Sequence, residues 1–335
     1  MARCHCAGSE FDFRVRRPLK PEHVYYAVEV LFAASTSFIA PVYVLFLIRR
    51  GLDYKGVALV DGFYMVSSAL LDYPTGGLAD KYGRGRIAAL GCLFFGLGLL
   101  SYSFSRNLWM FLCSEFLAAV GAALYSGAFM AWLVDSLKAE GRGEELASIL
   151  GSARILSLSV SVAGGFIGGF IAEHSLELPF AVGAISSFAA ALFALLWTRG
   201  RGGVEEFRGG GYWEYLSRGA RILIKSKPLI LMTVGSILGS LGMPSFNLTW
   251  APHMESMGAN ERLLGLASAV FMASMGVGSY MGGRLAERLG YRRAVILSLA
   301  LMAASFLSLT SMFDPYTFIV AALPFKVGAG MINPH

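Results

Sequence analysis

The sequence has 335 residues, of which 56% are hydrophobic and only 15% are charged. Its mean hydropathy is +0.59, whereas soluble domains carry about 25% charged residues. This composition excludes an ordinary soluble domain. The net charge of +6 does not indicate nucleic-acid binding, because the basic residues gather in short polar segments between apolar stretches.

Apolar stretches of about 18 to 28 residues recur along the chain, each long enough to cross about 30 Å of hydrocarbon as a helix. The first 22 residues contain no apolar stretch of signal-peptide length. We therefore predict an all-α polytopic membrane protein with about ten spans. The expected spans are 23–48, 56–78, 87–104, 108–136, 146–172, 178–198, 228–250, 262–283, 294–312 and a tenth that begins near Pro315.

The longest polar segment divides the chain into two halves. Residues 1–22 are expected to form a cytoplasmic tail and residues 23–198 a six-helix bundle. Residues 228–335 are expected to form a second bundle, truncated after the tenth span of the chain. The linker, 199–227, opens Gly-rich and then becomes amphipathic from Tyr212 to Ile224. This pattern favours a helix lying on the inner membrane surface, with a disordered linker as the alternative.

The distribution of basic residues predicts the orientation. With the N-terminus inside, the inner segments hold 21 Lys and Arg residues and the outer loops hold 5. The positive-inside rule then places the N-terminus in the cytoplasm.

Two segments share a dense pattern of glycine and charge at an offset of 207 residues. The first is "GGLADKYGRGR" (76–86) and the second is "GGRLAERLGYRR" (282–293). Both occupy the predicted inner loop between the second and third span of a half. We interpret them as marks of a duplicated six-helix unit, an architecture known among transporters. The offset pairs Gly76 with Gly283, Asp80 with Glu287 and Gly83 with Gly290.

The first segment resembles the signature Gly-x-Leu-Ala-Asp-Arg-x-Gly-Arg-Lys of the major facilitator superfamily. "DYPTG" (72–76) and "SGAFMAWLVD" (126–135) look like the branch with many drug-efflux proteins. The resemblance implies two pseudo-symmetric six-helix bundles, here without the last one or two helices. Two features depart from that branch: Glu115 stands where an Arg is common, and "SVAGGFIGGF" (161–170) lacks the usual Pro. Its glycines equally suit close helix packing.

The resemblance implies that the charged loop forms a conformational latch between the halves. We expect Gly76 to allow close helix approach and Gly83 to adopt a positive φ. Asp80 would cap a facing helix, and Arg84 would join Asp80 to Asp135. In the family Asp80 meets the eleventh helix, before which this chain ends. Gly283, Glu287 and Gly290 are the corresponding candidates in the second half.

Charged residues within spans cost about 2.5–3.5 kcal/mol each and therefore indicate function. Candidates for proton or substrate coupling are Glu29, Asp61, Asp72, Glu115, Arg154 and Lys326. Depth along the helices predicts one cluster of Glu29, Asp72 and Arg154, and a second pair of carboxylates toward the outer side. The alternative is a set of buried ion pairs that orient helices.

Two further features of the spans concern the substrate. Lys326 could attract an anionic substrate or pair with Glu115. Aromatic residues of the first and fourth spans, such as Tyr43 and Tyr125, could line an apolar pocket or simply pack.

No P-loop, zincin or nucleophile-elbow motif is present. Cys4, His5 and Cys6 lack a standard zinc spacing. We therefore expect no enzyme activity, cofactor or metal, and energy from an ion gradient.

The sequence predicts a secondary active transporter of the cytoplasmic membrane that works by alternating access. We favour proton-coupled efflux of an amphipathic compound. The alternatives are transport of a polar metabolite or organic anion, and a non-transporting remnant or sensor. Expected partners are the lipid bilayer, a small-molecule substrate and protons, with no nucleic acid, and the protein is expected to be a monomer.

Overall fold

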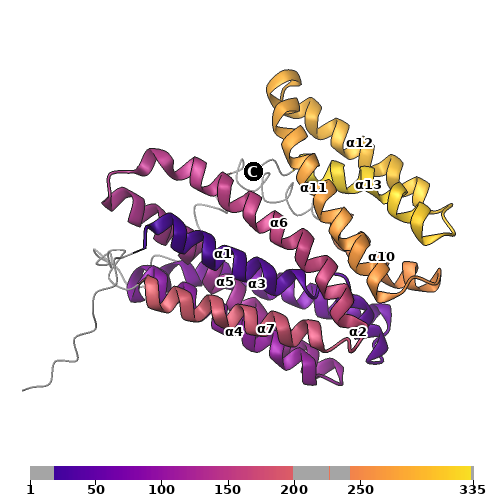
Figure 1. Cartoon of the computed structure of the whole chain (residues 1–335), viewed down its shortest axis with the longest axis horizontal. Helices are drawn as coiled ribbons and strands as arrows, with labels where there is room; N and C mark the ends of the chain where they lie inside the picture. Colours follow the sequence, from indigo (N-terminus) through magenta and orange to yellow (C-terminus); the bar gives the residue numbers. More distant parts are fainter. Residues whose placement is uncertain (1–18, 199–225, 227–241, 333–335) are drawn as a thin grey trace, which may run out of the picture.

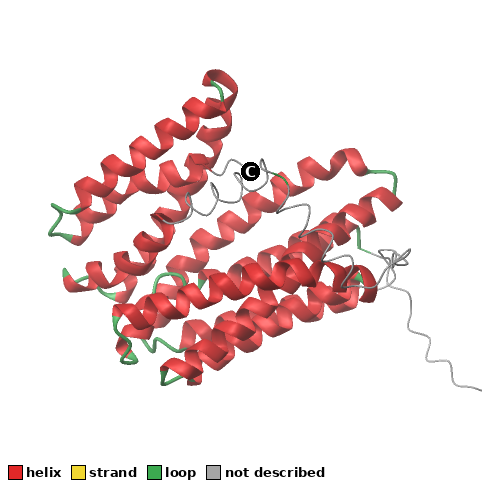
Figure 2. Cartoon of the chain, turned by 180° about the vertical axis from the view of Figure 1, so that it is seen from behind, coloured by secondary structure: helices red, strands yellow, loops and turns green. Residues whose placement is uncertain are grey.

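The computed structural model describes residues 19–198, 226 and 242–332, and within these ranges the chain forms helices and no strands. Figure 2 shows the same helical architecture from behind. The described α-helices are α1 (Pro21–Ser37), α2 (Tyr43–Arg49), α3 (Tyr54–Tyr82), α4 (Arg84–Phe104), α5 (Leu108–Ala139), α6 (Leu146–Ala172), α7 (Leu178–Trp197), α10 (Gly242–Ser256), α11 (Glu261–Leu289), α12 (Tyr291–Leu309) and α13 (Pro315–Ile332), with a short 3₁₀ helix, η1 (Gly143–Glu145), before α6.

The predicted repeat is realised in the helix boundaries. Helices α3 and α11 begin at Tyr54 and Glu261, α4 and α12 at Arg84 and Tyr291, and α5 and α13 at Leu108 and Pro315, as an offset of 207 residues requires. Such a repeated order of elements means that the two halves share one fold.

Helix capping follows the same repeat. Asp53 and Asn260 precede α3 and α11, and each accepts a hydrogen bond from the backbone N–H three residues later, at 2.8 and 3.0 Å. Asn107 and Asp314 do the same before α5 and α13, each at 3.0 Å. Because a side-chain cap satisfies one of the open N–H groups of the first turn, these four residues define where the long helices start.

Four glycines with positive φ mark the two ends of the bundle. Gly51 and Gly258 have φ of 93° and 91°, and Gly83 and Gly290 have φ of 95° and 83°. The predicted turn at Gly83 is confirmed. We call the end with Gly51 and Gly258 the Gly51 end, and the opposite end, with Gly83 and Gly290, the Gly83 end.

The expectation of about ten spans was an overcount. Within the described residues, seven helices are long and apolar enough to cross a membrane. The expected first span is divided into α1 and α2 by turns around Pro41, since proline lacks the N–H that continues a helix. Acidic and basic residues along α3 lower its hydropathy. Much of the expected span 228–250 lies outside the described residues.

Two other expectations fall on residues that the structure does not describe. These are most of the tail 1–22 and the amphipathic part of the linker 199–227.

Within the described residues, two pairs of helices make the main contacts between the two halves. α6 packs against α11, and α2 packs against α10. Figure 1 shows α10–α13 (orange to yellow) on one side and α1–α5 with α7 on the other, with α6 reaching α11. Both α2 and α10 lie at the Gly51 end (Figure 1). The junction between the halves is therefore built mainly near that end.

Glycine allows the close approach of α6 and α11. A Cβ atom on Gly169 would lie 2.6 Å from the carbonyl oxygen of Glu261 and from the Cα of Gly265. A Cβ atom on the neighbouring Gly168 would lie even closer to the carbonyl oxygen of Phe38, the residue that follows α1. Small residues let helix backbones touch in membrane bundles, so the glycine run of α6 serves close helix packing.

Candidate functional site

A cavity of about 310 Å³ lies between the two halves. α1 to α5, with the turn between α1 and α2, form one wall, and α10, α11 and α13 form the other. Aromatic and apolar side chains make most of the lining. The lining residues are Thr36, Ile39, Ala40, Tyr43, Val44, Asp61, Tyr64, Phe95, Leu99, Tyr102, Glu115, Ala118, Asn247, Trp250, Ser268, Phe271, Met272 and Lys326.

The cavity lies on the axis of the repeat. Several lining residues from the first half correspond, at the 207-residue offset, to lining residues from the second half. A ligand in this cavity therefore contacts equivalent positions of both halves. The corresponding pairs are Ala40 and Asn247, Tyr43 and Trp250, Asp61 and Ser268, and Tyr64 and Phe271.

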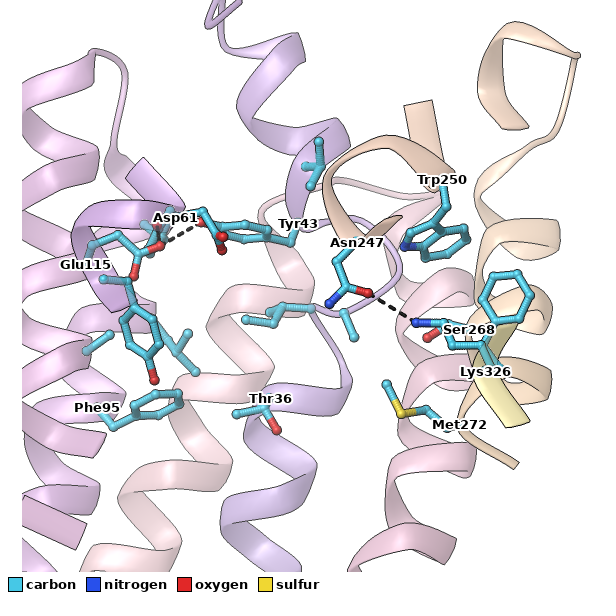
Figure 3. A pocket seen from close by; sticks show the side chains of 18 residues that line it. Thr36, Tyr43, Asp61, Phe95, Glu115, Asn247, Trp250, Ser268, Met272 and Lys326 are labelled. Atoms are coloured by element: carbon cyan, nitrogen blue, oxygen red, sulfur yellow. Dashed lines mark hydrogen bonds between the residues drawn. The ribbon is translucent and has the colours of Figure 1, made fainter. Parts of the chain in front are cut away.

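The first half supplies two carboxylates to the cavity. Glu115 on α5 is only 6% exposed, and one of its oxygens accepts a hydrogen bond from the Tyr43 hydroxyl at 2.7 Å and another from the Tyr102 hydroxyl. Asp61 on α3 lines the same wall (Figure 3). The structure thus brings together the two carboxylates expected toward the outer side.

The second half supplies one cation. Lys326 on α13 is 5% exposed; its ammonium donates to the Asn247 side-chain oxygen at 3.1 Å and lies 4.4 Å from the centre of the Phe246 ring. Figure 3 shows Glu115 and Asp61 on one side of the cavity and Lys326 on the other. Among the described residues, Lys326 forms no ion pair with Glu115.

The other three coupling candidates lie outside the cavity lining. Glu29 accepts a hydrogen bond from the Tyr125 hydroxyl at 2.9 Å, and the exposed Asp72 accepts one from the Ser126 hydroxyl at 3.2 Å. Arg154 is exposed on α6. No ion pair joins Arg154 to either carboxylate, so the three do not form one bonded cluster in this structure.

The charged loop at the Gly83 end forms a compact ion-pair network within the first half. Arg84, the first residue of α4, donates from Nε to Asp80 at 3.0 Å and from a terminal nitrogen to Asp135 at 2.5 Å. Asp80 therefore binds Arg84 rather than capping a facing helix. The turn at Gly83 allows α4 to fold back so that α3, α4 and α5 meet at one arginine.

The remaining candidate residues of the loop lie in open surroundings. A Cβ atom on Gly76 or Gly283 would meet no described atom within 4 Å, so no described helix packs closely on them here. Gly290 forms the turn equivalent to Gly83. Glu287 is exposed, and no ion pair of its side chain is found within the described ranges.

The sequence profile of the Major Facilitator Superfamily matches residues 26–335. The chain belongs to the major facilitator superfamily. Relatives in this superfamily include the multi-drug resistance efflux pump PmrA of Streptococcus pneumoniae, which is 24% identical over 315 residues, or 91% of this chain and 76% of PmrA. The uncharacterised transporter YxaM of Bacillus subtilis is 18% identical over 74% of this chain, and the match spans only 62% of YxaM.

Solved structures of transporters share this fold. The nucleoside transporter NupG superposes with a TM-score of 0.76 at 12% identity, covering 94% of this chain and 80% of NupG. A bacterial homologue of the lysosomal transporter Spinster, in an inward-facing and unoccupied conformation, superposes with a TM-score of 0.69 at 15% identity, covering 93% of this chain and 74% of that chain. These likenesses establish the fold.

At the Gly51 end of this superfamily fold, ion pairs bridge the two halves. Arg49 on α2 contacts Glu255 on α10 at 2.6 Å and Glu261 on α11 at 3.1 Å. Arg262 on α11 contacts Glu173 at the end of α6 at 2.5 Å. These pairs were not predicted from the sequence, although opposite charges occur in loops at the same end of both halves.

The hydrogen bond of Asn247 to Lys326 and those of Tyr43 and Tyr102 to Glu115 were not predicted from the sequence either. Of the aromatic residues proposed for the first and fourth spans, Tyr43 lines the cavity, whereas Tyr125 packs in the core of the first half. Within the described residues, no group of three or more His, Cys, Asp or Glu side chains is placed to hold a metal ion.

Proposed function

We propose that this protein is a proton-coupled secondary transporter that exports a small amphipathic compound by alternating access. The observation that carries the proposal is the 310 Å³ cavity between the halves, lined by both of them and containing Asp61, Glu115 and Lys326. A mostly apolar cavity with a few convergent polar groups is typical of a small-molecule site. Efflux pumps among the relatives support the direction of transport.

Glu115 is the residue that we propose to carry the coupling proton. Its carboxylate is buried in the cavity wall, where the ionised form is costly without a partner. Hydrogen bonds from two tyrosines compensate part of that cost, so proton gain and loss at this site both remain accessible. A second carboxylate, Asp61, on the same wall disfavours simultaneous ionisation of the pair.

We place the Gly83 end in the cytoplasm of a cell whose cytoplasmic membrane holds the protein, because the basic residues concentrate at that end. The ion pairs of the Gly51 end then close the outer side, and the structure corresponds to an inward-facing state. Labelling of Arg106→Cys from outside intact cells supports this placement; protection until the cells are opened contradicts it.

Proton coupling is tested with the purified full chain in proteoliposomes that contain a pH-sensitive dye. Ethidium, 4-(aminomethyl)benzoate and 4-methylbenzoate are added in turn across an imposed pH gradient. A transported compound dissipates the gradient in the wild type, and Glu115→Gln removes this proton flux while retaining exchange of labelled compound. The matched control is Glu144→Gln, an exposed position of η1. Gradient-driven flux that survives in Glu115→Gln contradicts coupling through this residue.

Lys326 favours one alternative, transport of an organic anion. Its ammonium lies in the cavity with no carboxylate paired to it among the described residues. In the same assay, an anion transporter gives proton flux with 4-methylbenzoate and with neither of the other two probes. Lys326→Gln should abolish that flux.

A further inference from the structure

The cavity keeps opposite charges on opposite walls. Glu115 and Asp61 belong to α5 and α3 of the first half, and Lys326 belongs to α13 of the second (Figure 3). Charges of opposite sign attract strongly at low dielectric, yet no ion pair within 4 Å bridges the cavity among the described residues. The space between them is therefore complementary to a ligand that carries both signs.

Each charged group is fixed by its neighbours and keeps unused bonding capacity. Tyr43 and Tyr102 both bind the same oxygen of Glu115, and no described group bonds to the second oxygen. The Lys326 ammonium has three donors, of which one is directed at Asn247. Two buried charges with unused hydrogen-bonding capacity face one cavity, and a ligand can satisfy both.

The charges break the symmetry of the repeat. At the 207-residue offset, Glu115 corresponds to Ala322 and Lys326 corresponds to Ala119, and both alanines are fully buried. The aromatic frame of the cavity is duplicated, but its charge pattern is not. A bound molecule with two different ends would therefore have one preferred orientation across the axis.

Building on the proposed function, we propose that the transported compound is a small zwitterion. Its ammonium group binds at Glu115 and Asp61, and its carboxylate or other monoanionic group binds at Lys326 and Asn247. An apolar body, preferably aromatic, separates the two charges.

Aromatic side chains of both halves line the cavity and can contact such a body. Trp250 and Phe271 come from the second half, and Tyr64 and Phe95 from the first. Aromatic faces give a flat apolar ligand large contact area at little conformational cost. Charged and aromatic side chains in one lining favour a zwitterion with an apolar body over a purely polar metabolite.

The test compares three probes of one shape: zwitterionic 4-(aminomethyl)benzoate, cationic 4-methylbenzylamine and anionic 4-methylbenzoate. Binding to the full chain in detergent is measured by thermal stabilisation over a range of probe concentrations. The zwitterion should bind about tenfold or more tightly than either singly charged probe, because each lacks one charge-assisted hydrogen bond.

Substitutions assign each end of the probe to one wall. Lys326→Gln should reduce the affinity for the zwitterion to that for the cation and leave the affinity for the cation unchanged. Glu115→Gln should reduce the affinity for the zwitterion to that for the anion and leave the affinity for the anion unchanged. Asn247→Ala provides a milder version of the first change if Lys326→Gln does not fold. The control Glu144→Gln, which lies outside the cavity lining, should leave the affinities of the three probes unchanged.

Equal binding of the cation and the zwitterion, unaffected by Lys326→Gln, overturns the inference while leaving a cation exporter intact. Equal binding of the anion and the zwitterion overturns it in favour of anion transport. Binding of none of the three overturns it as well, and the proton-flux assay with ethidium then decides the proposed function independently.

Discussion

The two ends of the helical bundle use charged side chains differently. At the Gly51 end, Arg49 and Arg262 form ion pairs that join the first half to the second. At the Gly83 end, Arg84 and Arg142 form ion pairs that stay within the first half. Among the described residues, ion pairs at the Gly51 end therefore hold the two halves together, whereas those at the Gly83 end join elements of the first half.

In alternating access, each state is closed at one end of the bundle and open at the other, and the asymmetry of the ion pairs fits this requirement. A cavity between two halves opens to one side only if the junction closes at the other. The pairs at the Gly51 end are partly exposed, with 48% of the Arg49 side chain accessible, so each contributes little and can be exchanged for water. Close glycine packing between α6 and α11 supplies the rest of the closure.

The largest expected effect comes from blocking that packing. Gly169→Val places a branched side chain against backbone atoms of α11, which cannot move aside. Overpacking of this kind costs about 1–3 kcal/mol, so closure of the Gly51 end and transport should fall about fivefold or more. The control is Gly151→Val on the same helix, where a Cβ meets no described atom within 4 Å. Equal transport by the two variants contradicts the assigned junction.

The next effect concerns the network at the Gly83 end. Asp135→Asn weakens the bond to Arg84, whose side chain is 17% exposed. A hydrogen bond between charged groups contributes about 1.5–3 kcal/mol, so the free energy of unfolding should drop by about that amount or less. Chemical denaturation in detergent measures it, with Lys138→Gln on the same helix as control. If Asp135→Asn also changes the distance between the two halves, the ion-pair network acts as the conformational latch expected from the sequence.

A smaller effect is expected from Arg49→Gln, which removes two bridging pairs at the Gly51 end. Exposed ion pairs contribute about 0.2–1 kcal/mol each, so loss of two of them should shift the balance between the two conformations about two- to thirtyfold toward opening of that end. Distances between spin labels at Arg106 and Phe313 report the shift. Lys55→Gln, at an exposed position of the same end, should produce none. A shift of the same size in both variants would show that the bridging pairs do not control the balance between the two conformations.

The smallest effect depends on pH. The hydrogen bond from Arg142 holds the pKa of Glu145 below its ordinary value of 4.5. A lowered pKa means that the stabilisation is fully present above the ordinary value and is lost as pH falls through the folded-state value. The Tm difference between the wild type and Arg142→Gln should therefore be largest near pH 7 and shrink below pH 4.5. A difference independent of pH would exclude this ion pair as its cause.

The helices and the repeat could be predicted from the sequence, because hydrophobic spans and paired glycine turns are visible directly in the order of the residues. The boundaries of α3 to α7 and α11 to α13 lie within a few residues of the expected spans. The division of the first span was less accessible, since Pro41 is compatible with a kink as well as a break.

The candidate site was only partly accessible from the sequence. Asp61, Glu115 and Lys326 stood out because a charge in an apolar span is costly. Their grouping around one cavity depends on helix rotation and on contacts between distant segments, which residue order does not encode locally. Depth along the helices placed Glu29, Asp72 and Arg154 at one level, but depth alone does not say which way a side chain points.

In the proposed transport cycle, the two ends of the bundle open alternately around the charged cavity. This motion is tested by measuring two distances in the full chain, with native cysteines replaced by serine and spin labels at repeat-related positions. One label pair, Arg106→Cys with Phe313→Cys, lies at the Gly51 end, and the other, Tyr82→Cys with Leu289→Cys, at the Gly83 end. The account predicts that ligand or a change of pH shifts the two distances in opposite directions. Distances that stay fixed, or that lengthen and shorten together, would contradict it.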